Sequence, residues 1–120
     1  MKEERIKNNL IVRLTFIFAL KIIKYCEELE RIKKYTIANQ LLKCGTSIGA
    51  NVWEAQNAES TKDFIHKFKI AGKEVDETQY WILLCKYSEN YPSTDELIKE
   101  HSVINRIINK IISTSKKDSN

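Results

Sequence analysis

The fold of this chain follows first from residues 37–55, which read IANQLLKCGTSIGANVWEA. Apolar side chains recur there at steps of three and four, which predicts an amphipathic helix. These are Ile37, Leu41, Cys44 and Ile48. Gly45 and Gly49 lie four residues apart on one helical face, although glycine inside a helix costs about 1 kcal/mol relative to alanine. We expect a close crossing by another backbone to offset this cost, in preference to a local break of the helix.

The same periodicity extends over most of the 120 residues and predicts a single all-α domain. The expected helices span 7–29, 35–58, 62–88 and 94–112, and the polar tail 113–120 is expected to fray. One proline and three glycines leave too few turn residues for a β-sandwich or barrel. Short connections between long helices favour an antiparallel, up-and-down four-helix bundle.

The helix expected at 7–29 carries two adjacent apolar stripes. The first consists of Ile11, Phe18, Ile22, Tyr25 and Leu29, and the second of Val12, Phe16, Ala19, Ile23 and Cys26. Together they are wider than one packed seam requires. We expect the excess to be buried against a second surface, inside the subunit or between subunits, and we predict a homo-oligomer.

Composition excludes several classes of protein. The apolar run of residues 10–20 is too short to span a bilayer, and it lacks the flanks of a signal peptide. Three cysteines without a C-x-x-C pair, Cys26, Cys44 and Cys85, indicate buried free thiols in a reducing cytoplasm. The two histidines, His66 and His101, belong to no Glu-x-x-His motif, so we predict neither a metal centre nor a cofactor.

Catalysis has little support in the sequence. Glu54, Glu74 and Glu77 are expected near apolar helix faces, where a carboxylate must accept hydrogen bonds or shift its pKa. The donors available to them are Thr46, Ser47, Asn51, Tyr80 and Trp81. A polar network, inside the subunit or at a subunit interface, is favoured over acid–base catalysis. Ser47 lacks the Gly-x-Ser-x-Gly spacing of a nucleophile elbow. We therefore predict no enzyme activity and no small-molecule substrate.

Basic residues are the more informative pattern. Lys62, His66, Lys69 and Lys73 are spaced four, three and four apart and share one helical face. The net charge of +4 is compatible with a polyanionic partner, although solvated helix faces are the alternative explanation. The predicted phosphate contacts are Lys21, Lys24, Arg31, Lys33, Lys34, Lys62, Lys69 and Lys73. Because Phe64 and Phe68 belong to the apolar face, we expect recognition of RNA shape and charge rather than of base sequence.

Several short motifs, taken together, resemble one family. They are Thr46-Ser47-Ile48-Gly49-Ala50-Asn51, Glu54-Ala55, Ser60 with Asp63-Phe64, Ile70-Ala71-x-Lys73-Glu74 and Glu77-Thr78-x-Tyr80-Trp81. This combination resembles the four-helix-bundle proteins encoded in bacterial 23S rRNA intervening sequences, which are similar to the accessory proteins of diversity-generating retroelements. Val52 and Trp53 depart from the smaller or β-branched residues common there.

The resemblance implies a ring-shaped homopentamer in the bacterial cytoplasm, without known catalytic residues. It also implies that the matching motif residues serve the fold and the assembly. These are Gly45, Ser47, Gly49, Asn51, Glu54, Glu74, Glu77 and Trp81. For the retroelement relatives it implies a basic surface for RNA or DNA and a reverse-transcriptase partner. The leading hypothesis is a non-enzymatic oligomer that binds structured RNA, and the alternative is a protein-interaction scaffold or accessory subunit without a nucleic-acid role.

Overall fold

Five α-helices and no strand make up residues 2–118, the part of the chain that the structure, a computed structural model, describes. The helices are α1 (Glu4–Asn8), α2 (Leu10–Arg31), α3 (Tyr35–Ala55), α4 (Thr61–Tyr87) and α5 (Asp95–Asp118). The all-α prediction is therefore confirmed.

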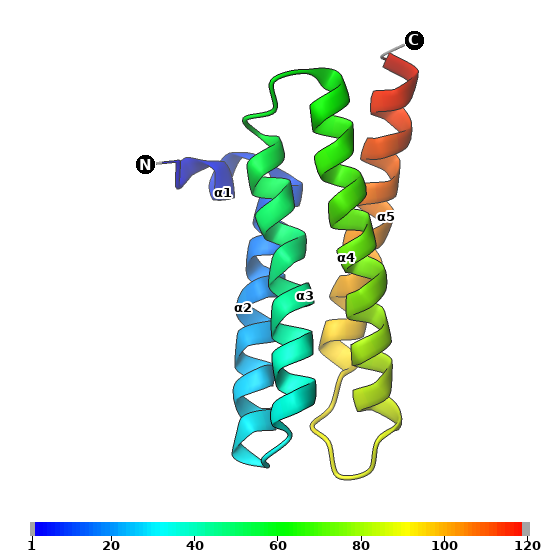
Figure 1. The fold of residues 1–120 in the computed structure, drawn as a ribbon. Coiled ribbons are helices and arrows are strands. Elements are labelled where there is room, and N and C mark those ends of the chain that lie inside the picture. The colour runs from blue at the N-terminus through cyan, green and yellow to red at the C-terminus, as the bar shows by residue number, and fades with distance from the viewer. Residues whose placement is uncertain (1, 119–120) are drawn as a thin grey trace.

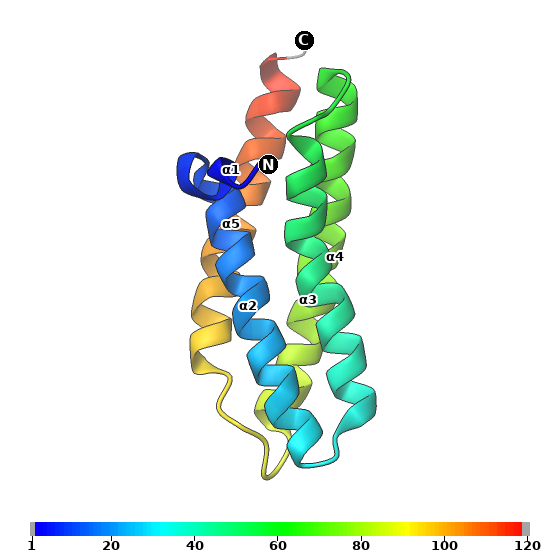
Figure 2. The same ribbon diagram turned by 90° about the vertical axis from the view of Figure 1, so that its left-hand side faces the viewer.

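The four long helices lie side by side, and successive helices run in opposite directions (Figure 1). Helix α2 contacts α3 and α5, and α4 contacts α3 and α5, so each long helix has two neighbours. The short α1 projects from the start of α2 (Figure 2). The molecule measures 49 × 30 × 21 Å along its principal axes. Its two ends are therefore well separated and can differ in charge.

The N-terminal boundary differs from the expected helix at 7–29. Asn9 adopts an extended conformation, with φ −129° and ψ 117°, and separates α1 from α2. Its side-chain oxygen accepts a hydrogen bond from the Val12 N–H at 3.3 Å. Asn9 is thus the N-cap of α2, because its short polar side chain satisfies a main-chain donor that the helix itself cannot.

The expected ends of two other helices also need correction. Helix α3 ends at Ala55 rather than residue 58, because the N–H groups of residues 56–58 bond three residues back instead of four. Helix α5 continues past residue 112 to Asp118. Half-buried Ile111 and Ile112 pack against the core. Two lysines in the last turn also stabilise the end of the helix, because cations interact favourably with the negative end of the helix dipole. The expected tail is therefore helical as far as Asp118, and residues 119–120 lie outside the described part.

The two stripes of α2 have different surroundings. All five residues of the first stripe are buried. In the second stripe Val12 and Cys26 are buried, whereas Phe16 and Ile23 each remain 40% exposed. The core of one subunit therefore accounts for part of the excess apolar surface and leaves the middle of the second stripe in solvent.

The glycine-containing face of α3 packs closely against α2, as expected. A Cβ atom at Gly45 would lie 2.9 Å from the buried Ile22 side chain, and one at Gly49 would lie 3.2 Å from the Thr15 carbonyl oxygen. Because α3 is continuous through both glycines, the close crossing is confirmed and the alternative of a local break is wrong.

The cysteines are free and buried, as predicted. Burial raises the pKa of all three thiols, and it raises the pKa of Cys26 to about 12. The neighbouring Tyr25 hydroxyl donates to the Pro92 carbonyl oxygen at 2.8 Å and so ties the α4–α5 connection to α2. These thiols are packing groups in the core rather than exposed nucleophiles.

We expect Gly45→Ala to lower the free energy of unfolding by about 1–3 kcal/mol, because the added methyl group would overlap Ile22 in a packed core. The matched control is Gly72→Ala on α4, where a Cβ would meet nothing within 4 Å. That change should raise stability by about 0.5–1 kcal/mol through helix propensity alone. Urea denaturation followed by circular dichroism measures both, and equal effects of the two substitutions would contradict the close crossing.

Stability should also fall as the pH rises through the alkaline range. The unfolded chain ionises Cys26 near its ordinary pKa of 9.0, whereas the folded chain holds the proton up to about 12. Protons bound by the folded state are lost on unfolding, so the free energy of unfolding decreases between these two values. Cys26→Ala should make the urea midpoint depend less steeply on pH there. A slope identical to that of the unsubstituted protein would show that the thiol does not contribute.

Candidate nucleic-acid interface

The cationic residues of α4 lie on its solvent side. Phe68, Ala71 and Val75 turn towards the core, and the opposite face presents Lys62, His66, Lys69 and Lys73, hereafter the α4 stripe. Ser60 begins the helix, since its hydroxyl oxygen accepts the Asp63 N–H at 3.0 Å. The three lysines form no ion pair within residues 2–118. Their charges therefore remain available to phosphates.

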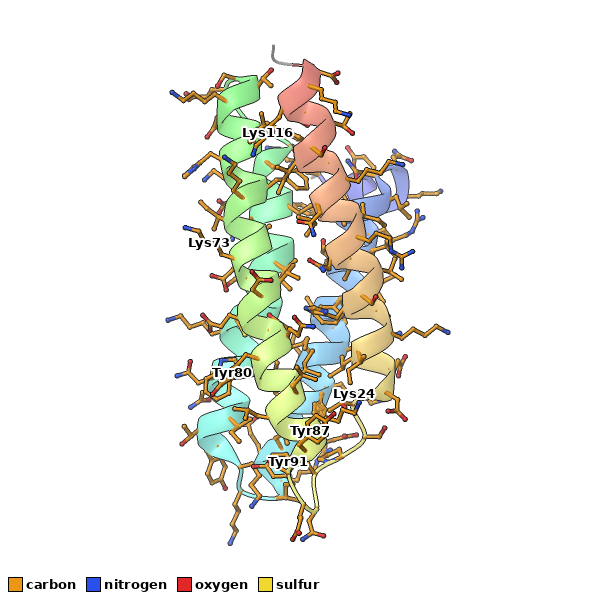
Figure 3. All side chains as sticks on the ribbon, turned by 90° about the vertical axis from the view of Figure 1, so that its right-hand side faces the viewer. Lys24, Lys73, Tyr80, Tyr87, Tyr91 and Lys116 are labelled. Atoms are coloured by element: carbon orange, nitrogen blue, oxygen red, sulfur yellow. The ribbon has the colours of Figure 1, made fainter. Side chains whose placement is uncertain are left out.

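Charge is distributed unequally along the long axis. If each long helix is divided near its midpoint, one end holds the α3–α4 connection, the start of α2 and the end of α5. This basic end comprises residues 2–19, 46–73 and 105–118 and carries twelve Lys or Arg against six Asp or Glu. The opposite half of the molecule carries eight Lys or Arg against ten Asp or Glu. Figure 3 shows two lysines of the basic end, Lys73 and Lys116, in the upper half of the molecule.

The eight predicted phosphate contacts do not form one surface. Lys62, Lys69 and Lys73 lie in the basic end, whereas the other five lie in the opposite half. Lys21 is engaged there: its Nζ lies 2.7 Å from Glu100 Oε2 and 2.6 Å from Glu96 Oε1. Hydrogen bonds to Glu100 and then Glu96 raise the pKa of Lys21, and Lys21 lowers the pKa of Glu96. This side chain joins α2 to α5 and is a poor candidate for RNA.

The remaining predicted cations follow the second half of α2 and the turn after it. Lys24 is exposed beside the acidic start of α5 (Figure 3). Arg31, Lys33 and Lys34 are exposed at the α2–α3 turn, where Lys33 has a positive φ of 63°. These three lie at the far end of the molecule from the α4 stripe, because α2 and α4 begin at the same end.

Sequence reasoning missed several cations of the basic end. Arg106, Lys110 and Lys117 follow one another on α5 at steps of four and seven, a spacing that places them on one face and could have been noticed. The position of Arg5 could not have been inferred from the sequence, because contacts with residues distant in the chain hold it. Its guanidinium donates to Asn57 Oδ1 at 2.7 Å and lies 5.5 Å from the Trp53 ring centre.

Within residues 2–118, the donors predicted for a polar network do not bond to Glu54, Glu74 or Glu77. Thr46, Ser47 and Asn51 donate to main-chain carbonyl oxygens of α3, and Glu54 pairs with Lys67 at 3.2 Å. Burial, and next the neighbouring Glu77, raise the pKa of Glu74. The other location left open for such a network, a subunit interface, stays a prediction.

No constellation for metal chemistry occurs in the described residues. Groups of three or more His, Cys, Asp or Glu side chains that could hold an ion are absent from residues 2–118. His66 is exposed on α4, whereas His101 is buried on α5 with Nε2 2.8 Å from the Val75 carbonyl oxygen. Nor is any helix in this range long and apolar enough to cross a membrane.

An apolar groove follows the outer seam between α2 and α3. It encloses about 250 Å³, and it combines Phe16 and Ala19 of α2 with Ala50 and Trp53 of α3. Gly49 lies at its floor, so the close crossing also shapes this surface. Leu20 and Ile23 of α2 and Leu42 of α3 are further exposed apolar residues on the two helices that form the groove. Contiguous exposed apolar patches often mark interaction sites.

Comparison with known proteins identifies the family. Residues 7–113 match the family model described as 23S rRNA-intervening sequence protein. A crystal structure of a protein of unknown function from the S23 ribosomal protein family of Bacteroides thetaiotaomicron is 34% identical, with a TM-score of 0.80. The alignment covers 85% of this chain and 97% of that one. No curated protein gives a significant match. Because the family model matches residues 7–113, most of its length, the chain belongs to the 23S rRNA-intervening sequence protein family.

Proposed function

We propose that this chain is a non-enzymatic, self-associating four-helix-bundle protein that binds structured RNA through its basic end. The observation that carries the proposal is the α4 stripe, whose lysines are exposed and free of ion pairs within residues 2–118. Cations aligned along a rigid helix bind phosphates without reading bases, so affinity should depend on RNA shape and on salt.

The unequal charge of the two ends supports an RNA-binding surface at the basic end. A phosphate backbone that approaches the basic end meets an excess of cations, whereas the opposite half has an excess of carboxylates. Arg106, Lys110 and Lys117 of α5 add exposed cations to the same end. This arrangement favours the α4 stripe over Lys21 and Lys24 as the main RNA contact and thereby narrows the surface expected from the sequence.

Self-association is supported by the apolar groove. Phe16 and Ile23 of α2 are each 40% exposed, and Leu20 between them is 53% exposed. A second copy that covers the groove would remove these side chains from water, at a gain of about 25 cal/mol per Å². A ring, with the pentamer as the expected size, needs two different surfaces on each subunit, of which the groove would be one.

RNA binding can be tested by reversing two charges of the α4 stripe. Lys69→Glu with Lys73→Glu should weaken binding to a blunt RNA duplex and lower the slope of log affinity against log salt by about two. The control, Lys24→Glu with Lys99→Glu, makes the same change in net charge in the acidic half and should leave both quantities nearly unchanged. Fluorescence anisotropy at low and moderate salt measures them.

Equal losses in the two double variants would show that only net charge matters, and no binding even at low salt would refute the RNA function. Purification with a protein and without nucleic acid would then favour the alternative, a protein-interaction scaffold or an accessory subunit, for example of a reverse transcriptase.

Phe16→Asp should disrupt the assembly, because it places a charge in the groove that a second copy would cover. Sedimentation equilibrium should then report the 14.0 kDa subunit, while circular dichroism retains the helical signal. Val103→Asp, at a similarly exposed apolar position on α5, is the matched control and should leave the assembly intact. If the unsubstituted protein is itself a 14.0 kDa species at micromolar concentration, self-association is wrong.

A further inference from the structure

Two chain connections meet at the end of the molecule opposite the basic end. The α2–α3 turn and the α4–α5 connection are both at the lower end in Figure 1. They are in contact, since Lys34 Nζ lies 5.5 Å from the centre of the Tyr91 ring. We call this surface the loop end and define it by Lys33, Lys34, Tyr35, Lys86, Tyr87 and Tyr91.

Aromatic rings are unusually accessible at the loop end. Tyr87 is 78% exposed and Tyr35 is 54% exposed, whereas Tyr91 is half-buried (Figure 3). Each ring has a lysine close by along the chain or in space: Lys86 Nζ lies 5.4 Å from the Tyr87 ring centre, and Lys34 directly precedes Tyr35. Rings in the core would serve packing, but Tyr35 and Tyr87 are largely in solvent, with the Lys86 ammonium over one face of the Tyr87 ring.

The turn that carries these lysines is held by the main chain. The Lys33 N–H donates to the Glu30 carbonyl oxygen at 2.9 Å, and the Lys34 N–H donates to the Leu29 carbonyl oxygen at 2.8 Å. The Tyr25 side chain, through its hydrogen bond to the Pro92 carbonyl oxygen, holds the α4–α5 connection. The loop end is therefore a preorganised surface, which lowers the entropic cost of binding.

Solvent-exposed aromatic rings next to cations are the features that bind unpaired nucleotides, because bases stack on the rings while phosphates approach the cations. Paired bases inside a duplex cannot stack in this way. We propose that the loop end binds an unpaired segment of RNA, with bases on Tyr87 and Tyr35 and phosphates near Lys33, Lys34 and Lys86. This inference rests on the proposed RNA function and adds the kind of RNA that is bound.

Carboxylates separate the loop end from the α4 stripe. Asp76 and Glu77 lie between Lys73 and Tyr87 on α4, and Glu30 and Glu89 flank the loop end itself. They disfavour a phosphate backbone that runs continuously along the helix, but they do not oppose uncharged bases. Lys73 and Tyr87 are about 21 Å apart along the helix. The expected ligand is therefore a folded RNA with a duplex for the α4 stripe and unpaired nucleotides for the loop end.

Two probes separate the two contacts: an oligouridylate, which has no duplex, and a blunt RNA duplex, which has no unpaired bases. Tyr35→Ala with Tyr87→Ala should weaken oligouridylate binding at least about fivefold, the loss expected for one stacked base, and should leave duplex binding within twofold. Tyr35→Phe with Tyr87→Phe retains the rings and should bind both probes like the unsubstituted protein. Because both side chains are exposed, we expect all four substitutions to leave the helical signal unchanged.

Unchanged oligouridylate binding by the alanine variant would overturn the inference, and so would an equal loss for both probes. If that variant instead changes the sedimentation mass while both affinities persist, the loop end is a subunit contact and the inference is wrong. The proposed function fails in a different way, when Lys69→Glu with Lys73→Glu leaves duplex binding intact.

Discussion

The close approach of α2 and α3 is the constraint on which the rest of the molecule depends. At Gly45 and Gly49 helix α3 has no side chain of its own, and the Ile22 side chain and the Thr15 backbone of α2 occupy the space that a Cβ would take. The intrinsic helical cost of glycine is offset by packing that no larger residue permits. This contact brings Phe16 and Trp53 to the rims of one shallow groove. One pair of small residues therefore determines both the internal seam and an external apolar surface.

The antiparallel order of the helices turns a chain of mixed charge into a molecule with unequal ends. Cations that are far apart in sequence, on α4 and α5, share one end of the molecule because α4 begins where α5 ends. The acidic residues gather in the other half for the same reason. Long-range attraction of a polyanion depends on such local excesses far more than on a net charge of +4.

The motifs shared with the family fall largely on packing positions rather than on the cationic surface. Gly45 and Gly49 form the crossing, and Trp81 packs against the core. Ser47 and Asn51 bond to the main chain of α3. Membership of the family therefore accounts for the fold, whereas the RNA proposals rest on side chains that lie outside most of these motifs, such as Lys69, Tyr35 and Tyr87.

The sequence by itself determined the helical class, the main apolar seams, a close helix crossing at Gly45 and Gly49 and the burial of the thiols, because periodicity and residue size act locally. It did not determine the break at Asn9 or the extension of α5 to Asp118, which depend on one capping bond and on packing of the last isoleucines. It also treated Lys21 and Lys69 alike. Only the tertiary structure separated them, since Glu96 and Glu100 reach Lys21 from another helix while Lys69 faces solvent. Which charges are matched, and which aromatic rings stay open, depends on contacts between residues distant in sequence, and no local pattern encodes those contacts.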